Sequence, residues 1–291
     1  VPGAGFAAQA STYRQAVLGP RHVDVMIEQA LSEADSAGDA PASEFYQQIA
    51  VVVMLAFYGG LRSSEIRSLT LADVIREADE TPAFDSDTLR AVLGHQPLRG
   101  SPGSAAAQSH DLVYINVLRG KTPAARRRAA LHAMAPERWL VRLARYVASR
   151  AEQSNRRRYD RIPLLPPLVS DDTNVDPIAA ARDWVSRFYG SQRDLHGLRH
   201  SAASYHFLRI AALRDPTLIE RLIDRDHPIF SEASLAALRR ELEHPQGELV
   251  WKRGLAEHWL SRTLGHSQLD TTMKTYVHTL SVVHSRFIVG F

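Results

Sequence analysis

The chain has 291 residues, of which 45% are hydrophobic and 23% are charged, and its mean hydropathy is −0.22. This composition is typical of a globular protein with a buried core and differs from that of disordered chains. The absence of cysteine excludes disulfide bonds, thiol catalysis and cysteine-ligated zinc. The longest apolar run, residues 49–57, is far shorter than the roughly 20 residues that span a bilayer. Because the first residues show no signal-peptide pattern either, we expect a cytoplasmic protein without a membrane partner.

The formal net charge is +3 and the sequence pI is about 9.3. The identity of the basic residues says more about the partner of the protein than this net charge does. Only three of the 35 basic residues are lysines, namely Lys121, Lys252 and Lys274, and the others are arginines. A guanidinium group donates two parallel N–H bonds to phosphate oxygens, which favours a nucleic-acid partner. Genomic codon bias toward arginine would produce the same composition, so composition alone leaves both interpretations open. Because lysine is rare here, a lysine inside a motif indicates a specific role.

The first third of the chain predicts helices followed by a loop. Residues 1–20 carry little periodic pattern and are expected to form a linker or tail. Apolar residues at helical spacing predict an amphipathic helix over 23–31, and the next helix is predicted from about Ser43, as its N-cap, to Gly59–Gly60. A short helix is expected just after Arg62, with Ser63 or Ser64 as its cap. Residues 79–110, rich in Pro, Gly, Ser and Asp, predict a long loop.

The rest of the chain predicts one β-hairpin and further helices. Two β-prone runs around a Gly-Lys-Thr-Pro turn predict the hairpin over 112–131. A helix with a buried stripe is expected to begin at Pro136, and a basic loop at 155–161. The later helices are predicted over Pro177–Tyr189 with Gly190 as the stop, from about His196, within the charge-rich residues 210–250, and near 255–263 and 271–279. The expected fold is therefore mostly α, with a small antiparallel sheet.

Three short motifs carry the chemistry: GLRSSEI at 60–66, HGLRH at 196–200, and LGH at 264–266 with Tyr276 ten residues after His266. In these motifs the chain resembles the tyrosine recombinase (phage integrase) family, which has the boxes G-L-R-x-S-E-I, H-x-L-R-H and L-G-H followed by a tyrosine. All three occur in the family's order, with Lys121 in the predicted hairpin between the first two. The resemblance covers residues 21–291 and implies the family's catalytic fold, double-stranded DNA as the partner, and a homotetramer in the synaptic complex that is a monomer without DNA.

The chemistry of these residues agrees with that resemblance. Tyr276 is the candidate nucleophile, although its ordinary pKa of about 10 means that it needs help to ionise. Arg62 and Arg199 stay charged and can each grip a non-bridging phosphate oxygen. His196, three residues before Arg199 on one helix, is the natural general base.

The remaining two catalytic candidates are Lys121, which could protonate the leaving 5′ oxygen as general acid, and His266, which would hold another phosphate oxygen. In this scheme two guanidiniums, an ammonium and two imidazoles supply the positive charge, so neither a metal ion nor another cofactor is expected. A phosphotyrosyl ester keeps the energy of the phosphodiester bond, so the step rejoins strands without ATP. We therefore expect a site-specific DNA recombinase or integrase, a DNA strand transferase with a covalent 3′-phosphotyrosyl intermediate.

Several supporting residues have two interpretations. Glu65 is either an acid at a helix start or a group that orients an arginine, as in the family. Arg126, Arg127 and Arg128 either form a solvated face or bind the DNA backbone beside Lys121. His200 stands four residues after His196, as in metalloprotease helices, but Gly197 occupies the position of their glutamate, so we interpret His200 as a supporting residue and expect no metal.

The chain departs from the family pattern at two places. The family usually has a helical DNA-clamp domain before the catalytic one, whereas only the short segment 1–20 precedes the first predicted catalytic helix here. Arg199 and His266 are also much farther apart than usual, so residues of about 210–252 are expected to be a helical insertion. Two rival functions stay open at this point: relaxation of DNA in the manner of a type IB topoisomerase, and DNA-binding regulation without catalysis. Integration, mobile-element transfer and chromosome resolution are equally compatible biological roles.

Overall fold

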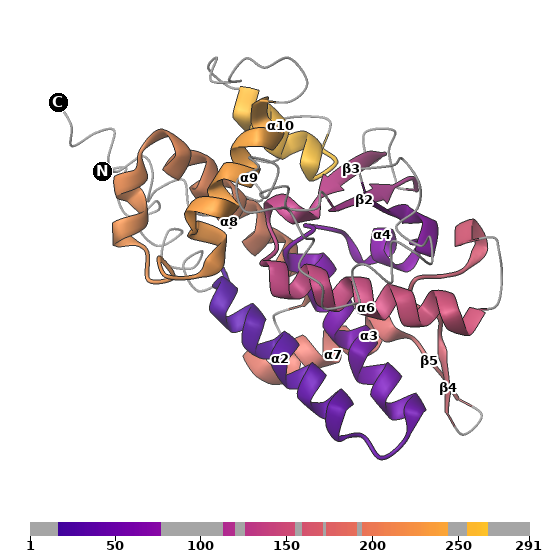
Figure 1. The fold of residues 1–291 in the computed structure, drawn as a ribbon. Helices are drawn as coiled ribbons and strands as arrows, with labels where there is room; N and C mark the ends of the chain where they lie inside the picture. The colour runs from indigo at the N-terminus through magenta and orange to yellow at the C-terminus, as the bar shows by residue number, and fades with distance from the viewer. Residues whose placement is uncertain are drawn as a thin grey trace, which may run out of the picture.

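A computed structural model describes residues 17–76, 113–119, 126–154, 159–170, 173–190, 194–243 and 255–266. Helices dominate these residues, and the short strands lie to one side of them (Figure 1). The expected mostly α fold with a small antiparallel sheet is therefore confirmed at this level. The predicted loop over 79–110 and the predicted helix near 271–279 lie outside the described residues. Within the described part of the chain, no helix is both long and apolar enough for a membrane span.

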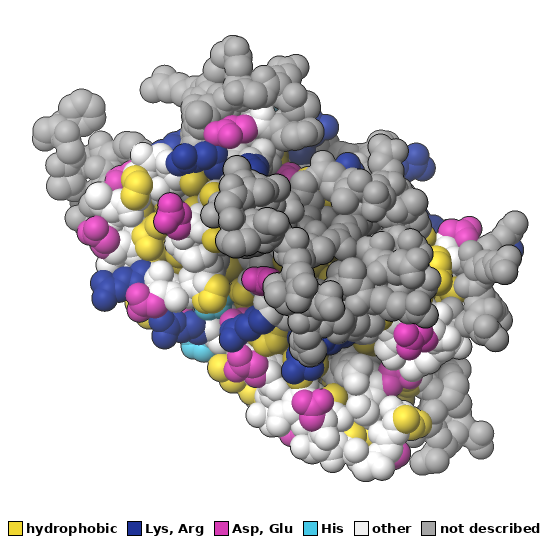
Figure 2. All heavy atoms as spheres, viewed as in Figure 1, with side chains coloured by type: hydrophobic (Ala, Val, Ile, Leu, Met, Phe, Trp, Pro, Cys, Tyr) yellow, Lys and Arg dark blue, Asp and Glu magenta, His cyan; other side chains and the backbone are white. Residues whose placement is uncertain are grey.

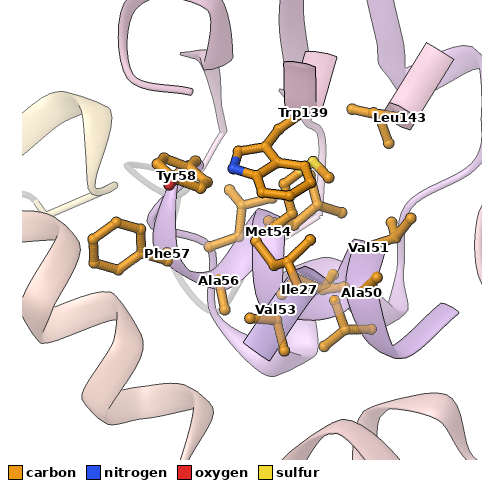
Figure 3. Packing of buried hydrophobic residues seen from close by; sticks show 14 of the residues in the cluster. Ile27, Ala50, Val51, Val53, Met54, Ala56, Phe57, Tyr58, Trp139 and Leu143 are labelled. Atoms are coloured by element: carbon orange, nitrogen blue, oxygen red, sulfur yellow. The ribbon is translucent and has the colours of Figure 1, made fainter. Parts of the chain in front are cut away.

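Helices α2 (Pro20–Ser36) and α3 (Ala40–Phe57) form an antiparallel pair, in which α2 buries one face and the second half of α3 is buried all round. The predicted start of the second helix at Ser43 was wrong, because Asp39 is the N-cap: its carboxylate accepts a 2.7 Å hydrogen bond from the Ala42 N–H. The apolar residues 49–57 are all buried, as expected of a helix that is apolar nearly all round. Figure 3 shows Met54 and Val53 of this helix packed among residues of its neighbours.

A buried carboxylate ties the helices of this core together. Asp24 of α2 is 4% exposed and accepts hydrogen bonds from the Tyr58 hydroxyl, from Trp139 Nε1 at 2.7 Å and from His227 Nε2 at 2.8 Å (the first two partners are labelled in Figure 3). Burial alone would raise the pKa of Asp24, but these hydrogen bonds lower it below its ordinary value. Trp139 belongs to α6 (Glu137–Ser154), whose buried stripe is the predicted one, with Leu140 only partly buried.

The sheet has the antiparallel order β1–β2–β3 within the described residues, formed by Val74–Arg76, Val113–Val117 and Arg127–Ala130. Ile115 pairs with Val74 on one side and with Ala129 on the other, which confirms the predicted hairpin of β2 and β3. Strand β1 follows α4 (Ser63–Arg67) and the 3-10 helix η1 (Leu71–Asp73). A second small hairpin, β4 (Leu168–Ser170) with β5 (Thr173–Val175), was not predicted. Further 3-10 turns are η4 (Leu131–Ala133) and η5 (Tyr159–Arg161).

Of the later helices, α7 and α8 pack on α3, and α10 contacts β3. Helix α7 (Pro177–Tyr189) ends at Gly190, where a φ of 87° suits only glycine, as predicted. Helix α8 (Leu195–Arg214) begins at Asp194, whose carboxylate accepts from the N–H groups of His196 at 2.9 Å and Gly197 at 3.1 Å. After α8 come η6 (Pro216–Arg221), η7 (Pro228–Phe230), α9 (Glu232–Glu243) and α10 (Leu255–Thr263).

The described part of residues 210–252 is largely helical and is packed into the molecule. Leu238 and Leu242 of α9 share a hydrophobic cluster with residues of α8 and α10. Arg209, fully buried, donates to the Ala133 carbonyl oxygen and, at 2.9 Å, to that of Ser234, while Glu241 accepts from the Tyr114 hydroxyl. These contacts join α9 to β2 and η4. The interpretation of this segment as an insertion stays a prediction.

Candidate active site

The first and third sequence motifs touch each other through two turns. Gly60 follows α3 and has a φ of +60°, and Gly265 follows α10 with a φ of 66°. A Cβ atom added at Gly60 would stand 2.9 Å from Leu264 Cδ2, closer than real Cβ contacts allow. The backbone conformation therefore favours glycine at position 60, whereas the close atom is the end of the Leu264 side chain, which can shift. The backbone of the first motif thus lies directly against the third.

The arginine of the second motif joins the other two. Arg199 of α8 is 0% exposed, and its Nη1 and Nη2 donate to the carbonyl oxygens of Gly60 and Leu264. Its Nη2 also lies 3.1 Å from His266 Nε2. The three motifs therefore meet at one guanidinium group. Because that group is covered and binds backbone oxygens, Arg199 could contact a phosphate only by exchanging one of these partners.

Glu65 is the negative centre of the cluster and is 1% exposed. Its carboxylate accepts from the Arg62 N–H at 2.8 Å and from Arg62 Nη1 at 2.9 Å, and it lies 3.7 Å from Arg199 Nη1. Arg127 of β3 binds both carboxylate oxygens, with Nη1 at 3.0 Å and Nη2 at 2.9 Å. Burial would raise the pKa of Glu65, but Arg127 above all, then Arg62 and Arg199, lower it, so the group is ionised. Both interpretations of Glu65 hold, because it completes the start of α4 and also orients arginines.

The three arginines around Glu65 differ in exposure. The side chain of Arg62 is 30% exposed, against 6% for Arg127 and 0% for Arg199. Among the side-chain hydrogen bonds that Arg62 makes with described residues, only its Nη1 takes part. The outer edge of the Arg62 guanidinium is thus the part of the cluster that can meet a ligand without rearrangement.

Arg127 differs from both of its predicted interpretations. It is neither on a solvated face nor at a surface where DNA could reach it, since its Nε donates to the Thr263 carbonyl oxygen at 2.6 Å and its fork binds Glu65. The cause is the alternation of side chains along β3, which turns Arg127 inward and Arg128 outward. Arg126 and Arg128 are exposed, and Arg128 lies 4.1 Å from the centre of the Tyr114 ring. These two residues keep their predicted role as candidate DNA contacts.

His266 is 8% exposed and uncharged. Burial first, and then the charges of Arg199, Arg62 and Arg127, lower its pKa to about 3. Its Nε2 must therefore accept from Arg199, which assigns the ring proton to Nδ1. The expectation that this imidazole adds positive charge is corrected: a neutral His266 offers a hydrogen bond, and the arginines carry the charge.

His196 lies at the start of α8 with its ring exposed. Burial and the charges of Arg199 and Arg62 lower its pKa, against an opposing effect of Asp194, so the imidazole is neutral and able to accept a proton. His196 and Arg199 stand three residues apart on α8. Its Nε2 is 3.0 Å from Nε2 of His200, one ring donating and the other accepting. Among the described residues, no group of three or more potential ligands forms a metal site.

The structure thus brings together Arg62, Glu65, Arg199 and His266, with His196 nearby, and adds Arg127, which sequence reasoning had assigned elsewhere. Lys121 and Tyr276 lie outside the described residues, so their roles stay predictions. Comparison of the chain with protein-family models, curated proteins and solved structures finds no match. The resemblance to tyrosine recombinases therefore rests on the three motifs and on the way their residues gather.

Proposed function

We propose that the protein is a DNA strand transferase of the tyrosine recombinase type, which cuts and rejoins DNA through a covalent 3′-phosphotyrosyl intermediate. The observation that carries the proposal is that one residue from each motif joins a single cluster: Arg62 and Arg199 lie against the buried carboxylate of Glu65, and His266 contacts Arg199. Motifs that matched a family pattern by chance would have no physical reason to share one cluster. The specific recombinase fold is part of the same proposal.

The charge of the cluster suits a phosphodiester. Three guanidinium groups face one carboxylate, and His266 is neutral, so the cluster retains two positive charges. A phosphodiester carries one negative charge and its pentacoordinate transition state carries two. Fixed positive groups at a partly buried site stabilise that added charge more than water does. Arg62, the most exposed of the three, is the group proposed to contact the phosphate first.

The proposed reaction balances without an added reactant. The phenol oxygen of Tyr276 forms a bond to phosphorus as the bond from phosphorus to the 5′ oxygen breaks. His196, neutral by its lowered pKa, accepts the phenol proton, and Lys121 gives a proton to the leaving 5′ oxygen. Attack by a 5′-hydroxyl on the phosphotyrosyl ester reverses these steps and joins the strand to a new partner. No metal ion or nucleotide takes part in this scheme.

Covalent capture of DNA tests the proposal. The protein is incubated in EDTA with nicked duplexes whose central sequence is randomised, and an SDS-resistant adduct is sought. The wild type and Tyr46→Phe should form it, whereas Tyr276→Phe should not. Tyr46 is a suitable control because it carries the same hydroxyl group roughly 16 Å along α3 from the end of that helix.

A plasmid relaxation assay and a DNA-binding assay, run beside the capture experiment, separate the rival functions. Sequence-independent relaxation of supercoiled plasmid by the wild type would indicate a topoisomerase instead. DNA binding without any adduct would indicate a regulator and would contradict the proposal.

A further inference from the structure

We propose that Arg127 is a positioning residue that fastens strand β3 to both α4 and the end of α10, and thereby sets the orientation of Arg62 and the position of His266. Its effect on DNA cleavage rests on the proposed function, whereas its effect on Glu65 does not. The role differs from the DNA-backbone contact that the sequence predicts for this arginine.

Arg127 contacts two of the three motif regions with a single side chain. Its Nη1 and Nη2 bind the two oxygens of Glu65 at 3.0 and 2.9 Å, and its Nε binds the Thr263 carbonyl oxygen at 2.6 Å. Thr263 is the last residue of α10 and stands three residues before His266. Figure 1 shows β3 next to α10, although more than a hundred residues separate them in the chain. A planar fork with five donors is suited to such a joint, and an ammonium group is not.

The bidentate pair with Arg127 determines which acceptor positions of the Glu65 carboxylate are left for its other partners. Each carboxylate oxygen accepts one N–H of Arg127, which leaves Arg62 bound through Nη1 and its backbone N–H. Without Arg127, the vacated acceptor positions would attract the remaining donors of Arg62 and turn its guanidinium inward. The Thr263 carbonyl would lose its donor at the same time, which loosens the turn that carries His266.

The pair also keeps Glu65 ionised. The charged groups that face this carboxylate are Arg62 at the start of α4, Arg127 on β3 and Arg199 on α8, while His266 after α10 is neutral. Arg127 makes the largest contribution to lowering the pKa of Glu65, against the burial that raises it. Loss of Arg127 should therefore let Glu65 take up a proton at a higher pH. If Arg127 only held β3 in place, its loss would leave the pKa of Glu65 unchanged.

The test uses Arg127→Gln and Arg127→Lys, with the neighbouring Arg128→Gln as the control for the stability measurement alone, because Arg128 is a candidate DNA contact. Arg128 is exposed on the same strand, so it controls for loss of one arginine from β3. The first measurement needs no DNA: the free energy of unfolding as a function of pH. In the wild type, the lowered pKa of Glu65 gives stability that is present above its unfolded pKa and is lost as the pH falls through its folded pKa. Arg127→Gln should reduce the loss of stability between neutral and acidic pH, and Arg128→Gln should leave it unchanged.

The second measurement is the rate of DNA adduct formation against pH. Arg127→Gln should slow adduct formation at least tenfold and move the acidic limb of its pH profile to higher pH. Arg127→Lys keeps the positive charge but not the planar fork. It should therefore return the acidic limb toward the wild-type pH while its rate of adduct formation stays low. A wild-type pH dependence of both stability and rate in folded Arg127→Gln would overturn the proposal. If that variant does not fold, a wild-type rate in Arg127→Lys would overturn the proposal equally. Absence of adduct in the wild type would refute the proposed function alone, because the stability measurement would still decide the role of Arg127.

Discussion

At the residue scale, the two glycines and Arg199 explain how distant motifs share one site. Arg199 binds the backbone of Gly60 and Leu264, not their side chains, so the contact depends on the shapes of two turns. Those turns are set by the positive φ values of Gly60 and Gly265. A buried guanidinium that is bound in this way is expensive to disturb, since it would be left without partners in a medium of low polarity.

Substitution of Gly60 tests this arrangement. Gly60→Ala should lower the free energy of unfolding by about 1–3 kcal/mol, the usual cost of a positive φ at a residue with a Cβ. Chemical denaturation at neutral pH measures the change. Gly38→Ala is the matched control, because a Cβ there meets nothing within 4 Å. Equal stability of the two variants would show that the turn at Gly60 does not hold the motifs together.

The sequence predicted most of the described site residues but not their individual environments. Arg62, Glu65, Arg199 and His266 were expected together because they stand in three ordered motifs. The inward direction of Arg127 was not predicted, since a run of three arginines does not by itself show which face of β3 packs against the core. A signal did exist in principle: of three successive residues in a strand, the middle one faces away from its neighbours.

At the element scale, helices were predicted better than strands. A helix such as Pro177–Tyr189 repeats its apolar spacing several times and ends at a recognisable glycine. Strands β1, β4 and β5 have three residues each, too few for an alternating pattern to appear. The start of α3 was misplaced because Ser43 and Asp39 are both good caps, and the Asp39 side chain holds the helix start in the structure.

Strand β3 also yields a prediction about DNA binding. Arg126 and Arg128 are exposed on one end of β3, and Figure 2 shows other basic side chains scattered over the same face of the molecule. Each phosphate contact releases counterions, so the affinity for duplex DNA should fall steeply with salt. Arg126→Gln and Arg128→Gln should each reduce the slope of log affinity against log salt by about one, as measured by fluorescence anisotropy.

The control for this experiment is Arg182→Gln, an exposed arginine on α7, which lies away from β3 (Figure 1). Its slope should equal that of the wild type. If all three substitutions lower the slope alike, the binding surface is not the one that β3 presents.

At the scale of the whole molecule, the helices packed around α3 bring residues that are far apart in the sequence into the cluster around Arg199 and Glu65. Gly60 comes from the turn after α3, Arg127 from the sheet, Arg199 from α8 and His266 from the turn after α10. Asp24 joins α2 to Trp139 of α6 and to His227 within the same core. The described part of residues 210–252 is tied to both β2 and α8.

The most direct measurement is the chemical identity of the amino acid that becomes attached to DNA. The adduct is digested with trypsin and nuclease, and the nucleotide-bearing peptide is sequenced by mass spectrometry. The account predicts a 3′-phosphonucleotide on the oxygen of Tyr276, and a loss of this peptide in Arg62→Gln. Attachment to any other residue, or through a 5′-phosphate, would contradict it.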